Sequence, residues 1–460
     1  MKRLAVLMTM AIAAGCSAAA SPPPSAPPIL PSRGPAVAPS VSAFLPAETL
    51  PPTPVPTVGI GLIREVRADG SRATAQDTSG STAQTVAAAD AAFALRLYHE
   101  LAARSDNLIY SPYSISTALS MTYGGAGGAT AEQLAAVLGV GSDPAAWHAG
   151  RNDIGSFLDR PPTDNSGSST PLTIEAANAL FGQDGFAFKP DYLDLLAGDY
   201  GAGLQAINFA ADPEAARAAI NRWVAVRTQN HIRQLLGPRT VDEMTRFVLV
   251  NAIYFKGSWA EPFKKSATKK ATFHRLDGSA VQVSTMRGSV AGDYRRGDGW
   301  QAVDRNYVNA TMTVILPDPG RFAAVERHLD AAFLAELAAK RRYTEIHLSL
   351  PRWSSASSLD LVDDLETLGI RDLFDSGRAD LRGIADAGFY VSQVVHQATI
   401  SVDEAGTEAA AATAVVGDTT GGGPDGEVTV KVDRPFIYLI RDSNTGEILF
   451  AGRVLDPTQR

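Results

Sequence analysis

The sequence predicts a mixed α+β fold with long strands, and three observations support this. Residues 87–105 place apolar side chains at helical spacing, and a second helical pattern follows Ser111-Pro112. Helical and strand-like stretches are interspersed along the chain, as in α+β domains. The strand-like runs are rich in β-branched and aromatic residues, and they cover 245–257, 310–318, 344–353, 390–403 and 428–440.

Composition and charge limit the classes of function. The chain has 460 residues, of which 45% are hydrophobic and 20% charged, as in ordinary soluble globular proteins with a large core. Its formal net charge of −8 argues against extensive nucleic-acid binding, and no block of Lys and Arg or interleaved basic and aromatic pattern contradicts this. We therefore expect no nucleic-acid partner, although a small basic patch for a polyanion is compatible with this composition.

The amino terminus has the pattern of a targeting signal. Lys2 and Arg3 precede an apolar run over 4–14, which is too short to span a membrane as a helix. We expect residues 1–15 to be a signal peptide. The mature protein would then leave the cytoplasm.

Cys16 is the only cysteine of the chain, so the protein can form no internal disulfide. It follows a small-residue cleavage pattern, Ala-Ala-Gly, and this position resembles the lipobox of bacterial lipoproteins, in which the cysteine carries the lipid anchor. Ala13 stands where that motif most often has Leu. Two interpretations stay open: a lipoprotein anchored to the membrane of the cell envelope through Cys16, or a secreted protein with an ordinary cleavable signal.

Residues 16–84 are expected to form a tether and linker. The stretch 21–57 is dense in proline and favours extended, semi-rigid conformations that bury no core. The stretch 58–84 holds one short apolar patch followed by polar low-complexity sequence, which leaves room for one added strand. We place the globular domain at 85–460.

The stretch 404–416, EAGTEAAAATAVV, does not suit its neighbours. It lies between two predicted strands, yet alanine is the strongest helix former and a weak strand former. Taken alone, such a run favours a helical turn. A glycine-rich segment, GDTTGGGPDG, follows it at 417–426.

Five segments resemble the serpin family of serine protease inhibitors, in the family's order, and together they span nearly the whole domain: 107–126, 179–196, 247–263, 400–416 and 430–454. The resemblance implies a serpin fold with a large mixed sheet A, further β-sheets, surrounding helices and an exposed reactive-centre loop. It also implies suicide-substrate inhibition, in which a serine protease cuts the loop and stays covalently attached while the loop inserts into sheet A.

The resemblance assigns the alanine-rich stretch to the hinge of that loop: Glu404, Gly406, Thr407, Glu408, Ala409, Ala410, Ala411, Ala412 and Thr413. An inserted strand needs small side chains on its inward face. With a two-residue period the odd-numbered residues from Thr407 to Gly417 are small or β-branched and uncharged, whereas Glu408 and Asp418 fall on the other face. No proline interrupts 404–423, and Gly406 gives the backbone freedom to fold inward.

Family correspondence places the scissile bond near Thr420-Gly421, with Asp418 and Thr419 as alternatives for the residue that enters the protease's specificity pocket. No Lys or Arg lies between Glu404 and Lys431, which argues against a trypsin-like target. A small residue such as Thr420 suits an elastase-like or subtilisin-like serine protease. Asp418 would instead suit an aspartate-specific one.

The resemblance also implies residues that control the opening of sheet A. Ser111, Ser114, Asn251 and His396 match the family's polar cluster where the sheet opens, while Trp259, Arg352 and Glu404 match the top of the sheet. Taken alone, His396 would be interpreted as a core histidine with a satisfied hydrogen bond. An Arg352–Glu404 pair would hold the hinge.

Other classes of function find little support. The chain has no HExxH, GxSxG or GxxxxGK motif, and one cysteine cannot build a thiolate zinc site. We expect no catalytic activity, no cofactor and no metal, and a monomer whose partner is the target protease. The main alternative keeps the fold without inhibition, as a non-inhibitory binding or chaperone-like surface protein.

Overall fold

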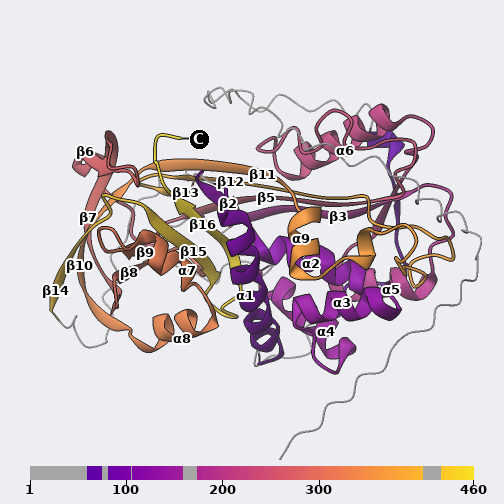
Figure 1. Cartoon of the computed structure of the whole chain (residues 1–460), viewed down its shortest axis with the longest axis horizontal. Coiled ribbons are helices and arrows are strands. Elements are labelled where there is room, and N and C mark those ends of the chain that lie inside the picture. Colours follow the sequence, from indigo (N-terminus) through magenta and orange to yellow (C-terminus); the bar gives the residue numbers. More distant parts are fainter. Residues whose placement is uncertain (1–59, 75–80, 105, 159–172, 408–425, 460) are drawn as a thin grey trace, which may run out of the picture. The chain divides into compact units, whose positions relative to one another are not determined.

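The computed structural model describes residues 60–74, 81–104, 106–158, 173–407 and 426–459 (Figure 1). These residues form two β-sheets surrounded by helices. Sheet A has the order β1-β4-β3-β5-β13-β12-β11. Its strands are β1 (Arg64–Val66), β3 (Thr173–Gln183), β4 (Leu204–Ile207), β5 (Phe247–Ser258), β11 (Trp353–Asp360), β12 (Gln393–Val402) and β13 (Gly406–Thr407).

The second sheet, sheet B, has the order β14-β10-β7-β8-β9-β15-β16-β2, and a further strand, β6, pairs with β7. Its strands are β2 (Leu108–Tyr110), β6 (Lys269–His274), β7 (Ala280–Gly297), β8 (Trp300–Asn306), β9 (Ala310–Pro317), β10 (Arg342–Pro351), β14 (Glu427–Lys431), β15 (Phe436–Asp442) and β16 (Ile448–Val454). The predicted α+β class with a large mixed sheet and further strands is confirmed.

The α-helices of the described residues are α1 (Ser81–Ala102), α2 (Pro112–Tyr123), α3 (Gly128–Leu138), α4 (Pro144–Leu158), α5 (Pro190–Tyr200), α6 (Pro213–Arg227), α7 (Phe322–Arg327), α8 (Ala331–Ala339) and α9 (Val362–Leu368). Short 3-10 turns cover Ile60–Leu62, Lys265–Ala267 and Asp372–Phe374. None of these helices is long and apolar enough to cross a membrane.

Helix α2 begins at the Ser-Pro pair that the sequence predicts as its start. Pro112 occupies the first turn, where its missing N–H costs nothing, and the Ser111 side chain caps the helix by accepting a hydrogen bond from the Ser114 N–H at 3.2 Å. The short strand β2 directly precedes it. The predicted strand and helix at 107–126 are therefore both confirmed.

One predicted strand is wrong in its extent. The run 428–440 forms two strands, β14 and β15, with a break before Phe436. β14 pairs in parallel with β10, whereas β15 pairs antiparallel with β9. Pro435 stands at the break, and because proline has no N–H to donate, it suits the connection between two ladders better than the interior of one strand.

The segment before the domain joins sheet A at its edge. β1 pairs antiparallel with β4, and Arg64 forms an ion pair with Asp184 at 2.6 Å. The stretch 58–84, in which the sequence left room for one strand, contains β1, and α1 already begins at Ser81.

β5 lies at the centre of sheet A and is covered on both faces (Figure 1). Val248, Val250 and Ala252 pack with α6 in one apolar cluster. Ile253 and Phe255 point to the opposite face and belong to the core shared with sheet B. Because both faces are buried, any strand that is added beside β5 must present side chains that fit between α6 and this core.

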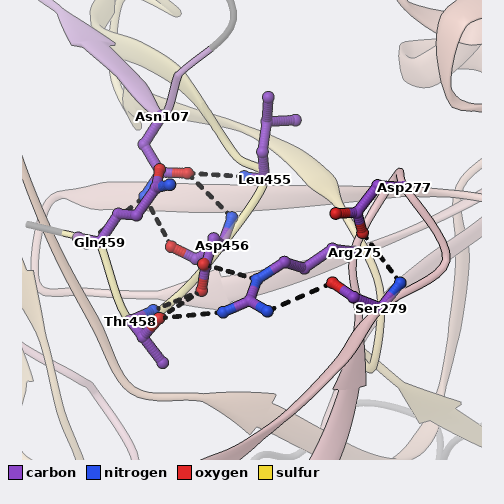
Figure 2. Close-up of polar contacts among 8 residues, drawn as sticks. All are labelled: Asn107, Arg275, Asp277, Ser279, Leu455, Asp456, Thr458 and Gln459. Atoms are coloured by element: carbon purple, nitrogen blue, oxygen red, sulfur yellow. Dashed lines mark hydrogen bonds and ion pairs between the residues drawn. The ribbon is translucent and has the colours of Figure 1, made fainter.

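A polar network joins the carboxyl-terminal segment to the rest of the protein (Figure 2). Asn107 accepts hydrogen bonds from the backbone N–H groups of Leu455 and Asp456, at 2.7 and 3.0 Å. The Asp456 carboxylate forms an ion pair with Arg275 at 2.6 Å and accepts the Thr458 hydroxyl at 2.7 Å. These contacts join the last described residues to the start of β2 and to the β6–β7 turn.

A charged cluster is buried between α1, α4 and the β15–β16 turn. The Asp90 carboxylate is paired with Arg151 and accepts the Ser116 hydroxyl at 3.2 Å, while Glu447 lies beside it without exposure. Burial raises the pKa of Asp90 despite the Arg151 guanidinium. Burial and the neighbouring Asp90 carboxylate raise the pKa of Glu447 well above its ordinary value.

The Glu447 carboxyl predicts a pH dependence of stability. Because its pKa is higher in the folded than in the unfolded protein, its contribution is fully present below about pH 4.5 and is lost as the pH rises through the folded pKa. We expect Glu447→Gln to flatten the fall in melting temperature that the wild-type protein shows as the pH rises above about 4.5. Glu132→Gln, at an exposed site in α3, is the control. An unchanged pH profile in Glu447→Gln would contradict the assignment.

Candidate functional site at the fork of sheet A

Sheet A contains a fork between its two central parallel strands. β5 and β12 pair directly from Val248 opposite Gln393 to Tyr254 opposite Thr399. Beyond this point the two strands separate, and β13 lies between them. Gly406 is opposite Ser258, and Thr407 is opposite both Gly257 and Val402. β13 therefore has the position of the first two residues of an added central strand.

The backbone at Gly406 accepts no other residue. Its φ is +144°, and a Cβ placed there would lie 2.1 Å from the carbonyl oxygen of Gly257. A tight turn precedes it, in which the Asp403 N–H donates to the Gly406 carbonyl at 2.8 Å. The predicted hinge glycine thus allows both the turn and the close approach to β5.

Thr407 is the first inward-facing residue of the hinge. It is fully buried, and its hydroxyl shares a hydrogen bond of 2.9 Å with the hydroxyl of Tyr307. The Tyr307 ring is stacked on Trp259 with 4.3 Å between centroids. These contacts place Thr407 on the core side of sheet A, the face on which the sequence requires small, uncharged side chains.

Trp259 holds the backbone of the hinge from the end of β5. Its backbone N–H donates to the Ala405 carbonyl at 3.0 Å, and its indole N–H donates to the Asp403 carbonyl at 2.9 Å. The Phe263 N–H donates to the Glu404 carbonyl at 2.9 Å. Three successive carbonyl groups before Gly406 are therefore fixed by one short segment.

The Glu404 side chain is buried and paired with a half-exposed arginine. Arg352 donates from Nε to the Glu404 carboxylate at 2.9 Å, and the Thr268 hydroxyl donates to the same oxygen. Burial alone would raise the pKa of Glu404, but the hydrogen bonds from Arg352 and Thr268 outweigh it and leave the pKa below its ordinary value. Glu404 is therefore ionised at neutral pH, and this pair is stronger than an exposed ion pair would be.

The polar residues predicted to control opening lie further along the sheet. His396 of β12 is directly opposite Asn251 of β5. The Ser111 N–H donates to His396 Nε2 at 3.0 Å, and the Ser114 hydroxyl lies 3.5 Å from the Asn251 carbonyl oxygen. The structure thus brings all four residues together at the amino end of α2.

His396 is neutral in this setting. Its side chain is fully buried, and this burial lowers its pKa to about 3. Nε2 accepts the Ser111 N–H, so the proton of the neutral ring is on Nδ1. Nδ1 and the Asn251 amide nitrogen both lack a hydrogen-bond partner within the described residues.

The sequence analysis missed Asn178 of β3. It lies directly opposite Asn251, and its side-chain oxygen accepts the Ser114 hydroxyl. Asn178, Asn251 and His396 therefore form one row across three strands. A polar residue within the otherwise apolar run AANALF (176–181) was the available signal.

The remaining predicted site residues lie outside the described residues. They are Glu408, Ala409, Ala410, Ala411, Ala412 and Thr413 of the hinge, Asp418, Thr419, Thr420 and Gly421 around the scissile bond, and Cys16. In the part of the chain that the structure describes, no three His, Cys, Asp or Glu side chains are grouped to hold a metal ion.

Gly406 offers a test of this geometry. We expect Gly406→Ala to destabilise the native protein by about 1–3 kcal/mol, because alanine meets both the φ of +144° and the Gly257 carbonyl. Thermal unfolding measures the change. Gly388→Ala is the matched control, since nothing lies within 4 Å of a Cβ there. Equal melting temperatures for the two variants would show that β13 does not occupy the fork.

Comparisons with known proteins agree with this architecture. The family model "Serpin (serine protease inhibitor)" matches residues 88–457. The chain is 34% identical over 369 residues to an uncharacterized serpin-like protein of Thermococcus kodakarensis, covering 79% of this chain and 84% of that one. It is 34% identical over 388 residues to the leukocyte elastase inhibitor of Bos taurus, covering 81% of this chain and all of that one.

A solved structure shows the same fold. The crystal structure of the thermophilic serpin tengpin in its native state superposes with a TM-score of 0.73 at 26% sequence identity. The match covers 86% of this chain and 99% of tengpin.

Proposed function

The chain belongs to the serpin family, and from that premise we propose that it is a suicide-substrate inhibitor of serine proteases. In this proposal the protease cleaves the reactive-centre loop and remains attached as an acyl-enzyme. The cleaved loop then inserts between β5 and β12 and traps it. The similarity to a leukocyte elastase inhibitor supports an inhibitory role in general.

The single observation that carries the proposal is the position of β13 in the fork. Its pairing with β5 sets Gly406 opposite Ser258, so a loop that continues this register sets Thr413 opposite Asn251. Its pairing with β12 sets Thr407 opposite Val402, so the same continuation sets Thr413 opposite His396. Both neighbouring strands thus predict the same register. In it the Thr413 hydroxyl would lie beside the Asn251 amide nitrogen and His396 Nδ1, which have no partner among the described residues.

The same register supports the predicted division of the loop into two faces. Thr407 lies on the core side, so the other odd-numbered residues up to Gly417 would follow it there. The charged residues would face the other way, with Glu408 opposite Lys256 and Asp418 opposite Arg246. Directly opposed cross-strand charges of unlike sign stabilise a sheet by about 0.2–1 kcal/mol per pair.

The free energy expected from loop insertion is comparable to the stability of a protease domain. About twelve inserted residues, at a net ~0.5–1.5 kcal/mol per hydrogen bond, give on the order of ten kcal/mol before packing is counted. A protease domain is stable by only about 5–15 kcal/mol. Insertion therefore supplies enough free energy to deform an attached enzyme and stall hydrolysis of the acyl intermediate.

The proposed target is an elastase-like or subtilisin-like serine protease, cleaving near Thr420-Gly421. The absence of Lys and Arg between Glu404 and Lys431 supports this choice over a trypsin-like enzyme. If cleavage follows Asp418 instead, an aspartate-specific protease is the target.

We propose that the protein acts as a monomer outside the cytoplasm, either held at a membrane of the cell envelope through a lipid on Cys16 or secreted. The signal-like residues 1–15 and the proline-rich tether support export. Mass spectrometry of the mature amino terminus distinguishes the two, because lipidation adds a defined mass to Cys16.

Incubation with a panel of serine proteases tests inhibition directly. A denaturing gel should show a covalent adduct with at least one elastase-like or subtilisin-like enzyme, and mass spectrometry of the released peptide locates the scissile bond. Cleavage without any adduct across the panel would contradict inhibition. It would favour a non-inhibitory binding or chaperone-like protein.

Thr407 should be essential for trapping. We expect Thr407→Arg to turn the inhibitor into a substrate, because a charged side chain would have to enter the buried site beside Tyr307. The readout is the ratio of adduct to cleaved protein on a gel. Thr407→Ser keeps the hydroxyl and is the control. Undiminished adduct formation by Thr407→Arg would refute insertion.

A charge exchange tests the register. We expect Lys256→Glu to lower the yield of adduct, because Glu408 would then meet a like charge when it inserts. The double variant Lys256→Glu/Glu408→Lys should recover most of the loss, measured as the moles of inhibitor needed per mole of protease. A double variant no better than the single one would contradict the pairing.

A further inference from the structure

Three strands of sheet B, β7, β10 and β14, form a shallow, open groove on the strands next to Gly426, where the described chain resumes. Its volume is about 340 Å³. Two rows of side chains meet at this groove; Arg287, Ser289, His347, Ser349 and Thr429 line it, and Lys431 lies beside the lining. Ser349 of β10 lies between Arg287 and Lys431, and His347 lies between Ser289 and Thr429. Directly opposed residues of neighbouring strands share a face of the sheet, so each row presents its side chains together.

The first row carries two cations without partners. Arg287 and Lys431 are both exposed, and neither side chain makes an ion pair or hydrogen bond within the described residues. His347, by contrast, is bonded to Ser289 at 2.6 Å and lies 3.5 Å from Glu427. Two free cations on either side of the Ser349 hydroxyl suit one carboxylate group. The positive row also stands out on a chain whose net charge is −8.

The groove lies within reach of a protease bound to the loop. Gly426, where the described chain resumes, is anchored through its carbonyl by the Thr344 hydroxyl at 2.7 Å and the Glu345 N–H at 3.1 Å. The proposed scissile bond is only a few residues before Gly426, which corresponds to at most about 20 Å of extended chain. Lys431 follows Gly426 at a similar distance along the chain. A protease domain has a radius of gyration of about 18 Å, so the groove lies within the span of an enzyme that binds the scissile bond.

We propose that the groove is a docking site for a carboxylate on the rim of the target protease's active-site cleft, and that Arg287 and Lys431 select proteases with an acidic rim. This inference rests on the proposed inhibitory function. A soluble polyanion is the competing occupant. The protease is favoured because the groove offers one pair of cations around one hydroxyl and stands beside the loop, whereas a linear polyanion needs a longer basic track.

The test uses the full chain and two subtilisins made catalytically inactive by replacement of the active-site serine. One carries added carboxylates on the rim of its cleft, and the other carries added lysines there. Biolayer interferometry at low salt should show the acidic-rim enzyme binding about fivefold or more tightly than the basic-rim enzyme. Because no chemistry occurs, the measurement is independent of whether the active enzyme is trapped.

Variants test whether Arg287 and Lys431 cause the tighter binding of the acidic-rim enzyme. Arg287→Gln/Lys431→Gln should remove it, and Arg287→Glu/Lys431→Glu should reverse it in favour of the basic-rim enzyme. Lys269→Gln/Lys270→Gln removes the same charge from β6, at another edge of the sheet, and should leave the preference in place. Melting temperatures check that each variant is folded.

Equal affinities of the wild type for both enzymes would overturn the proposal. So would an equal loss in the β6 control, which would show a general electrostatic effect and not a docking site. Dextran sulfate that binds through Arg287 and Lys431 while both enzymes bind alike would assign the groove to a polyanion. Absence of a covalent adduct with active proteases would instead count against inhibition alone.

Discussion

The structure depends on an incomplete backbone ladder between β5 and β12. The two strands are parallel and bonded to each other only as far as Tyr254 and Thr399. Beyond that rung, and as far as the described residues reach, each strand pairs with the two residues of β13. A central strand of a sheet normally has both edges paired along its length, so a fork in a buried sheet is a place where more hydrogen bonds can form. Gain of those bonds is the driving force of the proposed mechanism.

The surrounding residues hold β13 in place at the start of this fork. The Glu404 carboxylate is held by Arg352 and Thr268, and the carbonyl groups of residues 403–405 are bound by Trp259 and Phe263. Further along, the sheet is less well satisfied. Among the residues that the structure describes, the Asn251 amide nitrogen and His396 Nδ1 are buried without partners, and an unpaired buried polar group costs about 1–3 kcal/mol. The row that an inserting strand would have to pass thus contains two buried groups that could gain hydrogen bonds.

Much of this arrangement was predictable from the sequence because it rests on local rules. Alternation of side chains along the strand predicted the inward face of the hinge, and the backbone freedom of glycine explained why Gly406 suits the hinge. Motif resemblance supplied Arg352, Trp259 and His396. The division of the hinge into two faces required only the residue types and their spacing, whereas the gating residues required the family resemblance.

Other features depend on which strands meet, and no local pattern contains that information. Asn178 matters because β3 lies beside β5 in a register that sets it opposite Asn251. The Asp90–Arg151 pair joins two helices that are far apart in the chain, and Glu447 reaches it from a β-turn. The docking groove combines residues of β7, β10 and β14. Such clusters follow from the topology of the sheets.

A crystal structure of the protein after cleavage of its loop tests the central claim most directly. The account predicts a full additional strand between β5 and β12, antiparallel to both, with Thr413 opposite Asn251 and His396. A cleaved protein in which β5 and β12 remain paired as before, with the new end of the loop outside sheet A, would contradict it.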